Sequence, residues 1–289
     1  MDKKNKIIYI VSDSRSGSTL LEFILSQSDI VSSIGEVHHL DSHLNEEKWG
    51  TQWDWQCSCG DKISQCSFWR KVLDDLKVKG FPEIRNTEFI RQNSNPLSFG
   101  NSTYKVDGNF DFTLRLLQEI YSSVLHIDET EVVIDSSKNI HQFRALHENS
   151  DMDLNLIFIV RDIRAVVLSK RKWQVKYGQK LTNLFVLLFM TKFKYFMQRR
   201  VYSQICKSKR IFIKYENLAN YSKDTISEIN KQFNIPQFNV PEYMIRQDNH
   251  SIGGTPNRMK KKIQLDNSWR NESLKKPFFH FIGWFLNLL

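Results

Sequence analysis

Short apolar runs rich in β-branched residues alternate along the chain with longer segments whose apolar positions recur every three or four residues. The short runs predict strands at residues 7–12, 31–35, 131–134, 154–160 and 210–215. The periodic segments predict helices at residues 18–28, 111–126, 140–148, 163–172 and 181–206. This alternation is typical of a three-layer α/β fold, in which helices cover both faces of a central parallel sheet.

Two parts of the chain depart from the alternation. Residues 37–105 are rich in Trp, Asn, Ser and Gly, and we interpret them as an irregular insertion that shapes a binding pocket within one domain spanning residues 1–289. The apolar residues 277–289 are too few to span a membrane. Docking on the chain itself, on a partner or at a membrane interface remains open for them. The apolar stretch 184–190 is interpreted as core.

Composition narrows the class of protein and of ligand. A hydrophobic content of 40% and a charged content of 25% over 289 residues indicate a globular protein. The net charge of +9 favours an anionic ligand or surface. We interpret the basic run 258–262 as a solvated loop and expect no nucleic-acid partner. No signal peptide or membrane span is recognised, so a cytoplasmic location is expected, with membrane association through residues 277–289 as the alternative.

The clearest chemistry lies in residues 12–19, which follow the first predicted strand and open a helix. Backbone N–H groups, the helix dipole, Arg15 and several hydroxyls there suit a phosphate or sulfate group. Compared with the ATP-binding pattern G-x-x-x-x-G-K-[ST], the segment keeps Gly17 and Thr19. It has Ser12 in place of the first glycine and Ser18 in place of the lysine. We therefore expect an anionic nucleotide other than ATP.

Polar residues also follow three other predicted strands, namely Glu36, residues 135–138 and Arg161. The carboxyl ends of parallel strands meet at one edge of a sheet, and ligands bind at that edge. These clusters and residues 12–19 therefore predict one shared site.

Four segments, in this order, resemble sulfotransferases that use 3′-phosphoadenosine 5′-phosphosulfate (PAPS), in the bacterial and Golgi branches that include carbohydrate and tyrosylprotein sulfotransferases. They are Ser14-Arg15-Ser16-Gly17-Ser18-Thr19-Leu20-Leu21, residues 133–138, residues 158–169, and residues 250–258 followed by Trp269. Ile163 and Thr255 depart from the family pattern, which has Pro and Asn there. The resemblance covers residues 7–270 and implies a P-loop NTPase-like fold.

The resemblance also implies a role for each segment. The PAPS site would comprise Arg15, Ser16, Gly17, Ser18, Thr19, Leu20, Ser137, Arg161, Ser169 and Arg258. Within it, Arg161 and Ser169 would bind the 3′-phosphate. Arg15 and Lys138 would stabilise the charge that develops on the bridging oxygen during in-line displacement. Glu36 is the predicted general base, with His38 and His39 as rivals.

The expected acceptor is a hydroxyl on a saccharide or glycolipid, and Trp49, Trp53, Trp55 and Trp173 are candidates for stacking on sugar faces. No metal is required, because Arg, Lys and N–H groups meet the donor's charge. Two alternatives stay open. One is a P-loop kinase of a small molecule or nucleotide, which Ser18 disfavours. The other is a nucleotide- or glycan-binding protein without catalysis.

Three of the four cysteines, Cys57, Cys59 and Cys66, lie close together in the sequence. We expect them to be reduced and structural. A zinc site completed by His38, His39 or His43 is one alternative. A Cys57–Cys66 disulfide in an oxidising compartment is the other.

Overall fold

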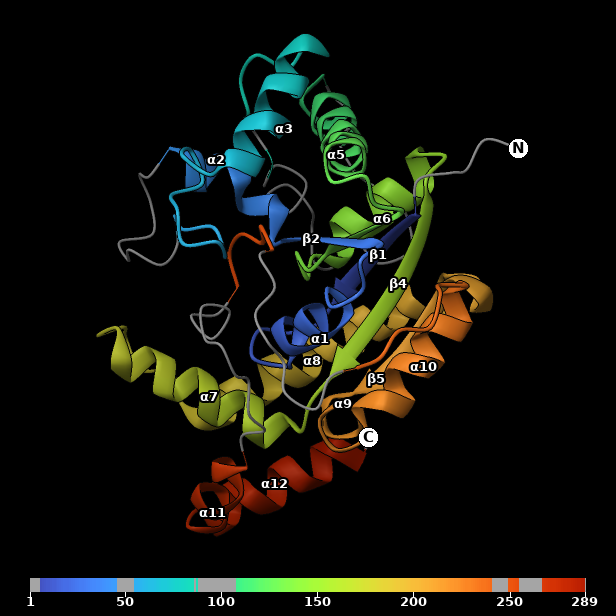
Figure 1. Cartoon of the computed structure of the whole chain (residues 1–289). Coiled ribbons are helices and arrows are strands. Elements are labelled where there is room, and N and C mark those ends of the chain that lie inside the picture. Colours follow the sequence, from blue (N-terminus) through green and yellow to red (C-terminus); the bar gives the residue numbers. More distant parts are fainter. Residues whose placement is uncertain are drawn as a thin grey trace.

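The computed structural model describes residues 6–45, 55–85, 87, 108–240, 249–254 and 267–288, and these contain a five-stranded sheet (Figure 1). The strand order is β2-β3-β1-β4-β5, and every neighbouring pair is parallel. The strands are β1 (Lys6–Val11), β2 (Val31–Gly35), β3 (Val132–Asp135), β4 (Asp153–Val160) and β5 (Arg210–Lys214). The predicted α/β class and parallel sheet are confirmed.

Helices cover both faces of the sheet because successive strand residues point in opposite directions. Ile8 and Ile10 of β1 pack with α1 (Ser18–Leu25), α9 (Tyr215–Asn220) and α10 (Ser222–Phe233). Ile7, Tyr9 and Val11 face the opposite layer, which contains α5 (Gly108–Ile127), α6 (Ile140–Asn149) and the C-terminal part of α8 (Leu184–Gln204).

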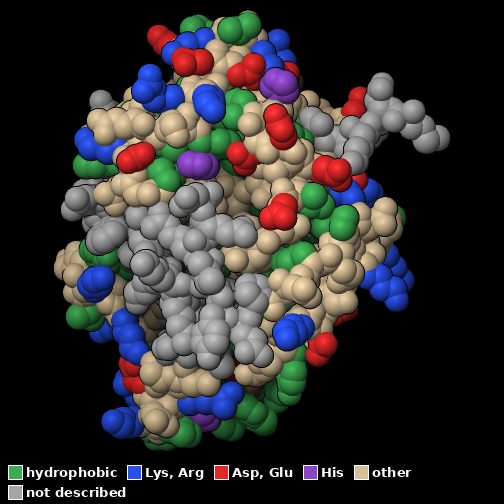
Figure 2. Space-filling model, in the orientation of Figure 1, with side chains coloured by type: hydrophobic (Ala, Val, Ile, Leu, Met, Phe, Trp, Pro, Cys, Tyr) green, Lys and Arg blue, Asp and Glu red, His purple; other side chains and the backbone are tan. Residues whose placement is uncertain are grey.

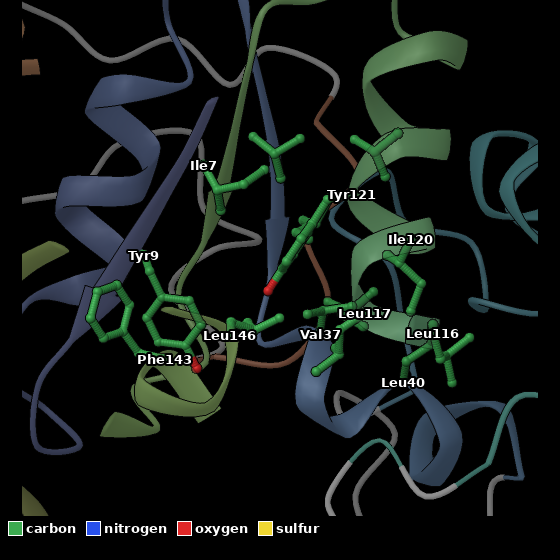
Figure 3. Packing of buried hydrophobic residues seen from close by; sticks show 14 of the residues in the cluster. Ile7, Tyr9, Val37, Leu40, Leu116, Leu117, Ile120, Tyr121, Phe143 and Leu146 are labelled. Atoms are coloured by element: carbon green, nitrogen blue, oxygen red, sulfur yellow. The ribbon is translucent and has the colours of Figure 1, made fainter. Parts of the chain in front are cut away.

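The second layer forms the larger of these two buried clusters. Figure 3 shows Tyr9 of β1 beside Phe143 of α6, and Leu117 and Tyr121 of α5 projecting toward the sheet. The Tyr9 and Phe143 ring centroids are 5.5 Å apart. Since burying one large apolar side chain contributes about 1.5–3 kcal/mol, this packing holds α5 and α6 against the sheet.

A third cluster joins α7 (Ile163–Lys176), α8, α11 (Ser268–Leu274) and α12 (Pro277–Leu288). Phe279, Gly283 and Leu286 are the buried residues of α12. A Cβ at Gly283 would lie 2.4 Å from Cγ of Arg164, so glycine permits the close approach of α12 to α7. The C-terminal segment therefore docks on the chain's own helices, although its other face is exposed.

The interpretation of residues 37–105 as irregular was wrong in part. The segment contains a 3₁₀ turn (Val37–His39), α2 (Leu40–Leu44) and the amphipathic α3 (Ser67–Val78). The buried residues of α3, Phe68, Trp69, Val72 and Leu76, recur with a helical period that its charged residues obscure. Residues 46–54, 86 and 88–105 lie outside the described part of the chain.

The interpretation of residues 184–190 as core was also wrong in part. Leu187 and Leu188 are buried, but Val186, Phe189 and Met190 are exposed. Only one side of α8 faces the protein, so an apolar run longer than one turn cannot be buried throughout. The first predicted helix ends at Leu25 rather than at residue 28. Among the described residues, no helix is both long and apolar enough to cross a membrane.

A carboxyl group is buried at the end of β3. Asp135 accepts hydrogen bonds from the Tyr121 hydroxyl at 2.6 Å and from the backbone N–H of Ser137 at 2.7 Å. Burial raises the pKa of Asp135 to about 7, although these hydrogen bonds favour the charged form. The folded chain therefore holds a proton there that the unfolded chain, with an ordinary Asp pKa of about 3.9, has lost.

This buried carboxyl group predicts a pH-dependent stability. Because the folded-state pKa is raised, its contribution is complete below about pH 4 and is lost as pH rises through about 7. We expect the unfolding free energy of the wild type, relative to that of Asp135→Asn, to fall by roughly 2–3 kcal/mol between about pH 5 and pH 8 in urea titrations. A difference that stays the same across this pH range would contradict this assignment.

Candidate functional site

The predicted polar clusters meet at the carboxyl edge of the sheet. The turn before α1 follows β1, Glu36 follows β2, residues 136–138 follow β3, and Arg161 follows β4. After β1 the chain moves toward β2 at one edge of the sheet, whereas after β4 it moves toward β5 at the opposite edge. Loops that leave adjacent strands in opposite directions leave a crevice between them. Arg15 and Arg161 lie on the two sides of this switch point.

The β1–α1 turn has an unusual backbone. Arg15 has a φ of 69° and Gly17 a φ of 98°, so both are left-handed. A Cβ at Gly17 would lie 2.2 Å from a ring carbon of Tyr215, so only glycine fits beneath this ring. A non-glycine residue in this conformation costs free energy, and such strain is concentrated at functional sites. The turn brings backbone N–H groups to the N-terminus of α1, where the helix dipole favours an anion.

Asp13 anchors this turn. Its carboxylate is buried and accepts hydrogen bonds from the Ser14 N–H at 2.8 Å, from Lys194 at 2.9 Å and from Lys170. Burial raises the pKa of Asp13, but the two lysines outweigh this and lower it below its usual range. The carboxylate therefore stays charged and ties the turn to α7 and α8.

Two guanidinium groups converge beside the turn. Arg161 donates to the backbone carbonyl of Arg15 at 3.3 Å and lies over the ring of Tyr215, 4.4 Å from its centroid. Arg15 donates to Oγ of Ser169 at 3.1 Å and lies 4.9 Å from the ring centroid of Trp173. Burial and the charge of Arg161 lower the pKa of Arg15, although Tyr177 opposes this. An anion bound here would relieve the repulsion between the two arginines.

The predicted residues Arg15, Arg161 and Ser169 are thus brought together, with Arg15 linking the other two. Ser16 joins the same network, because its Oγ lies 2.8 Å from the hydroxyl of Tyr195. That hydroxyl also accepts from the backbone N–H of Arg161 at 3.3 Å. The predicted residue Ser18 is buried at the start of α1.

Glu36 and Lys138 form an ion pair on the other side of the site. The Lys138 ammonium donates to Oε1 of Glu36, and each side chain is 13% exposed. His39 Nε2 lies 4.0 Å from Oε2 of Glu36. The Oγ of Ser137 accepts from the backbone N–H of His38 at 3.2 Å. The predicted catalytic pair is therefore in direct contact, with a rival base beside it.

Residues 251–254 lie over this pair. The N–H of Glu36 donates to the carbonyl of Ile252 at 2.8 Å, and a Cβ at Gly35 would lie 2.1 Å from that oxygen. A Cβ at Gly254 would lie 3.5 Å from Oγ1 of Thr19 and 3.7 Å from Oε1 of Glu36. Gly254 thus lies close to both Thr19 and the candidate base Glu36. A small pocket opens beside it, lined by Thr19, Glu22, Phe23, Ser58, Asn249, Ser251, Ile252, Gly253 and Gly254.

Glu22 was missed by the sequence analysis. Its buried carboxylate accepts hydrogen bonds from the hydroxyls of Ser33, Ser136 and Ser251. These serines come from β2, from the turn after β3 and from the segment over Glu36. The available signal was an acidic residue within the apolar helix Ser-Thr-Leu-Leu-Glu-Phe-Ile-Leu.

The remaining predicted residues are either placed elsewhere near the site or lie outside the described part of the chain. Residues 135–137 are not used to cap the helix after β3, because Asn139 caps it with a side chain that accepts from two backbone N–H groups. Trp173 contacts Arg15. Arg258, Trp49 and Trp53 lie outside the described residues.

Comparisons with known proteins agree with this architecture. The profile of a family described as "Sulfotransferase family" matches residues 8–239. The sulfotransferase domain from the curacin biosynthetic pathway is 17% identical, with a TM-score of 0.58, and the alignment covers 94% of this chain and 92% of that one. The sulfotransferase domain of the Synechococcus PCC 7002 olefin synthase is 17% identical, with a TM-score of 0.52 and coverage of 93% and 90%. At such identities these two structures support the fold alone.

A comparison with curated proteins found no match. The profile match extends from β1 to beyond α10 and therefore includes the β1–α1 turn, Glu36, Lys138 and Arg161. The chain belongs to the sulfotransferase family.

Proposed function

We propose that this sulfotransferase uses PAPS and transfers its sulfuryl group to an acceptor hydroxyl on a saccharide or glycolipid. The observation that carries the proposal is the convergence of Arg15 and Arg161 beside the N-terminus of α1. The half-buried Arg15, the buried Arg161 and a row of backbone N–H groups fit a nucleotide with phosphates at both its 3′ and 5′ positions.

The residues fit the donor in two parts. The turn and first helical residues, Arg15 to Leu20, would hold the 5′-phosphosulfate. Arg161 and Ser169, which both contact Arg15, would hold the 3′-phosphate. Ser137 and Arg258 complete the proposed donor site. No metal ion is needed in this scheme, because arginine, lysine and N–H groups meet the donor's charge.

The same geometry disfavours a kinase. Ser18 occupies the position of the ATP-binding lysine and is buried. Magnesium in such enzymes needs an available carboxylate near the phosphates. Three aspartates lie at the carboxyl ends of strands in the described part of the chain, and each has protein partners. Asp13 binds two lysines, Asp135 binds Tyr121, and Asp162 binds Arg164.

Bound PAPS would supply a sulfuryl group activated by its bond to phosphate. Glu36 would then accept the proton of the attacking hydroxyl, and its ionised form is held in place by Lys138. Arg15 and the N–H groups of the turn would stabilise the charge that develops on the leaving oxygen, an effect typically worth a few kcal/mol. The covering segment 251–254 would exclude water from this exchange.

The acceptor is proposed to lie close to a membrane surface, which favours a glycolipid. α12 exposes Phe278, Phe281, Trp284, Phe285 and Leu288, and α8 exposes Val186, Phe189, Met190, Phe193 and Phe196. The rings of Phe185 and Phe278 contact each other, so the two helices are joined. Hydrophobic side chains are visible along the lower rim of Figure 2, over α12. α7 and α8 contain Lys and Arg but neither Asp nor Glu, and α12 contains none of these four residue types, so the net charge of the three helices suits anionic lipid.

The donor assignment predicts the effect of removing Arg161. In calorimetry without metal, we expect the wild type to bind adenosine 3′,5′-bisphosphate and Arg161→Ala to bind it roughly 30- to 100-fold more weakly, because a charge-assisted contact of about 2–3 kcal/mol is lost. Arg70→Ala, at an exposed position of α3, should bind like the wild type. Tighter binding of Mg-ATP than of the bisphosphate would favour the kinase instead.

The base assignment predicts a split between turnover and binding. Glu36→Gln keeps the size of the side chain and its ability to accept from Lys138. With ³⁵S-labelled PAPS and a panel of hydroxyl acceptors, we expect transfer to fall by about 10²- to 10⁴-fold while bisphosphate affinity stays within about twofold. His39→Gln is the matched variant. If it lowers transfer more than Glu36→Gln does, the histidine is the base.

The membrane proposal predicts binding to lipid vesicles. We expect the wild type to sediment with phosphatidylglycerol vesicles and the double variant Trp284→Ser, Phe285→Ser to lose at least about tenfold in affinity, because two large apolar side chains no longer enter the interface. Val78→Ser removes a side chain that is 87% exposed on α3 and serves as the control. The proposal fails if the wild type does not bind, or if the control loses as much affinity.

A further inference from the structure

Three cysteines and a histidine converge on one point away from Arg15 and Arg161. Cys57 and Cys59 lie in the loop before α3, Cys66 lies at the N-terminus of α3, and His250 comes from the segment that leads to Ser251. Each offers one ligand atom, and all four atoms lie within 4.8 Å of one another. The fold brings them together although His250 lies 184 residues after Cys66 in the sequence.

The separations between these atoms match a tetrahedral site. Sγ of Cys66 lies 3.7 Å from Sγ of Cys57 and 3.7 Å from Sγ of Cys59. Nδ1 of His250 lies 3.2 Å from Sγ of Cys66 and 3.5 Å from Sγ of Cys57. With Zn–S bonds of about 2.3 Å and Zn–N bonds of about 2.0 Å, a tetrahedral zinc site has S···S separations of about 3.8 Å and S···N separations of about 3.5 Å.

We infer that Cys57, Cys59, Cys66 and His250 bind one structural Zn²⁺ ion. Tetrahedral coordination by sulfur and nitrogen is typical of zinc, and four protein ligands leave no open position for catalysis. The cysteines are free rather than joined in a disulfide. The inference departs from the sequence-based expectation of metal-free cysteines. It also takes its fourth ligand from His250 instead of His38, His39 or His43.

The surroundings hold the ligands in place. The ring of His250 stacks on Phe68, with centroids 4.6 Å apart and an interplanar angle of 8°. The indole N–H of Trp69 donates to the carbonyl of His250 at 2.7 Å. The N–H of Cys57 donates to the carbonyl of Asp61 at 2.8 Å, and this closes the loop. Contacts that orient ligands in this way are a regular feature of metal sites.

The site would join α3 to the segment over Glu36. His250 directly precedes Ser251, which binds Glu22, and Ile252, whose carbonyl accepts from the N–H of Glu36. In addition, the N–H and the hydroxyl of Ser58 both donate to the carbonyl of Ser251. A zinc ion would therefore fix one end of this segment, which has no helix or strand of its own to hold it.

The experiment measures metal in the full chain. Protein purified without added metal should contain about one zinc ion per chain by mass spectrometry, and X-ray absorption should give three sulfur ligands and one nitrogen ligand. Cys206→Ser, at the exposed fourth cysteine, should keep the ion, whereas Cys59→Ser should lose most of it. A strong chelator should lower the melting temperature of the wild type, and added Zn²⁺ should restore it.

A second readout does not depend on whether Cys59→Ser folds. Wild-type protein stripped of metal and loaded with Co²⁺ should show the thiolate-to-cobalt charge-transfer bands of a tetrahedral site. Folded wild type without bound zinc, or an ion surrounded by oxygen ligands, would overturn the inference. Equal loss of zinc from Cys206→Ser and Cys59→Ser would also overturn it.

Discussion

The buried carboxylate of Glu22 is the contact on which the geometry of the site depends. It accepts hydrogen bonds from three serines that belong to β2, to the turn after β3 and to the segment over the site. A buried carboxylate is costly unless it is fully hydrogen-bonded. The three segments that supply the serines must therefore stay in position for Glu22 of α1 to be buried. The β1–α1 turn, Glu36 and Lys138 each lie within a few residues, along the chain, of Glu22 or of one of its serine partners.

The two sides of the site differ in charge, because one is mainly basic and the other carries an ion pair. On one side Arg15 and Arg161 converge, and Asp13 is held by Lys170 and Lys194. On the other side Glu36 pairs with Lys138. Under the proposed function, the first arrangement would bind the anionic donor, and the second would accept a proton from the acceptor. The glycines of residues 251–254 bring the two sides together, because a larger residue at Gly253 would meet Cβ of Glu36 at 2.8 Å.

Much of the fold could be predicted from local pattern. Residues 154–160 are apolar except for Asn155, Gly17 lies in the turn between β1 and α1, and Arg161 follows β4 directly, so the sheet and its polar edge follow from the sequence pattern. Glu22 and Tyr215 could not be assigned in the same way, because their roles depend on contacts between segments far apart in the sequence. The same holds for His250, which meets Cys57 and Cys66 only through the tertiary fold. Helix α3 was missed because its charged face hides a regular apolar one.

We propose that the β1–α1 turn and Arg161 bind the two phosphate positions of one nucleotide. The most direct test is a crystal structure of the chain with adenosine 3′,5′-bisphosphate. We expect the 5′-phosphate to lie against the backbone N–H groups of residues 16–19, and the 3′-phosphate to lie within hydrogen-bond distance of Arg161 and Ser169. A nucleotide bound elsewhere, or one whose 3′-phosphate does not contact Arg161, would contradict this binding mode.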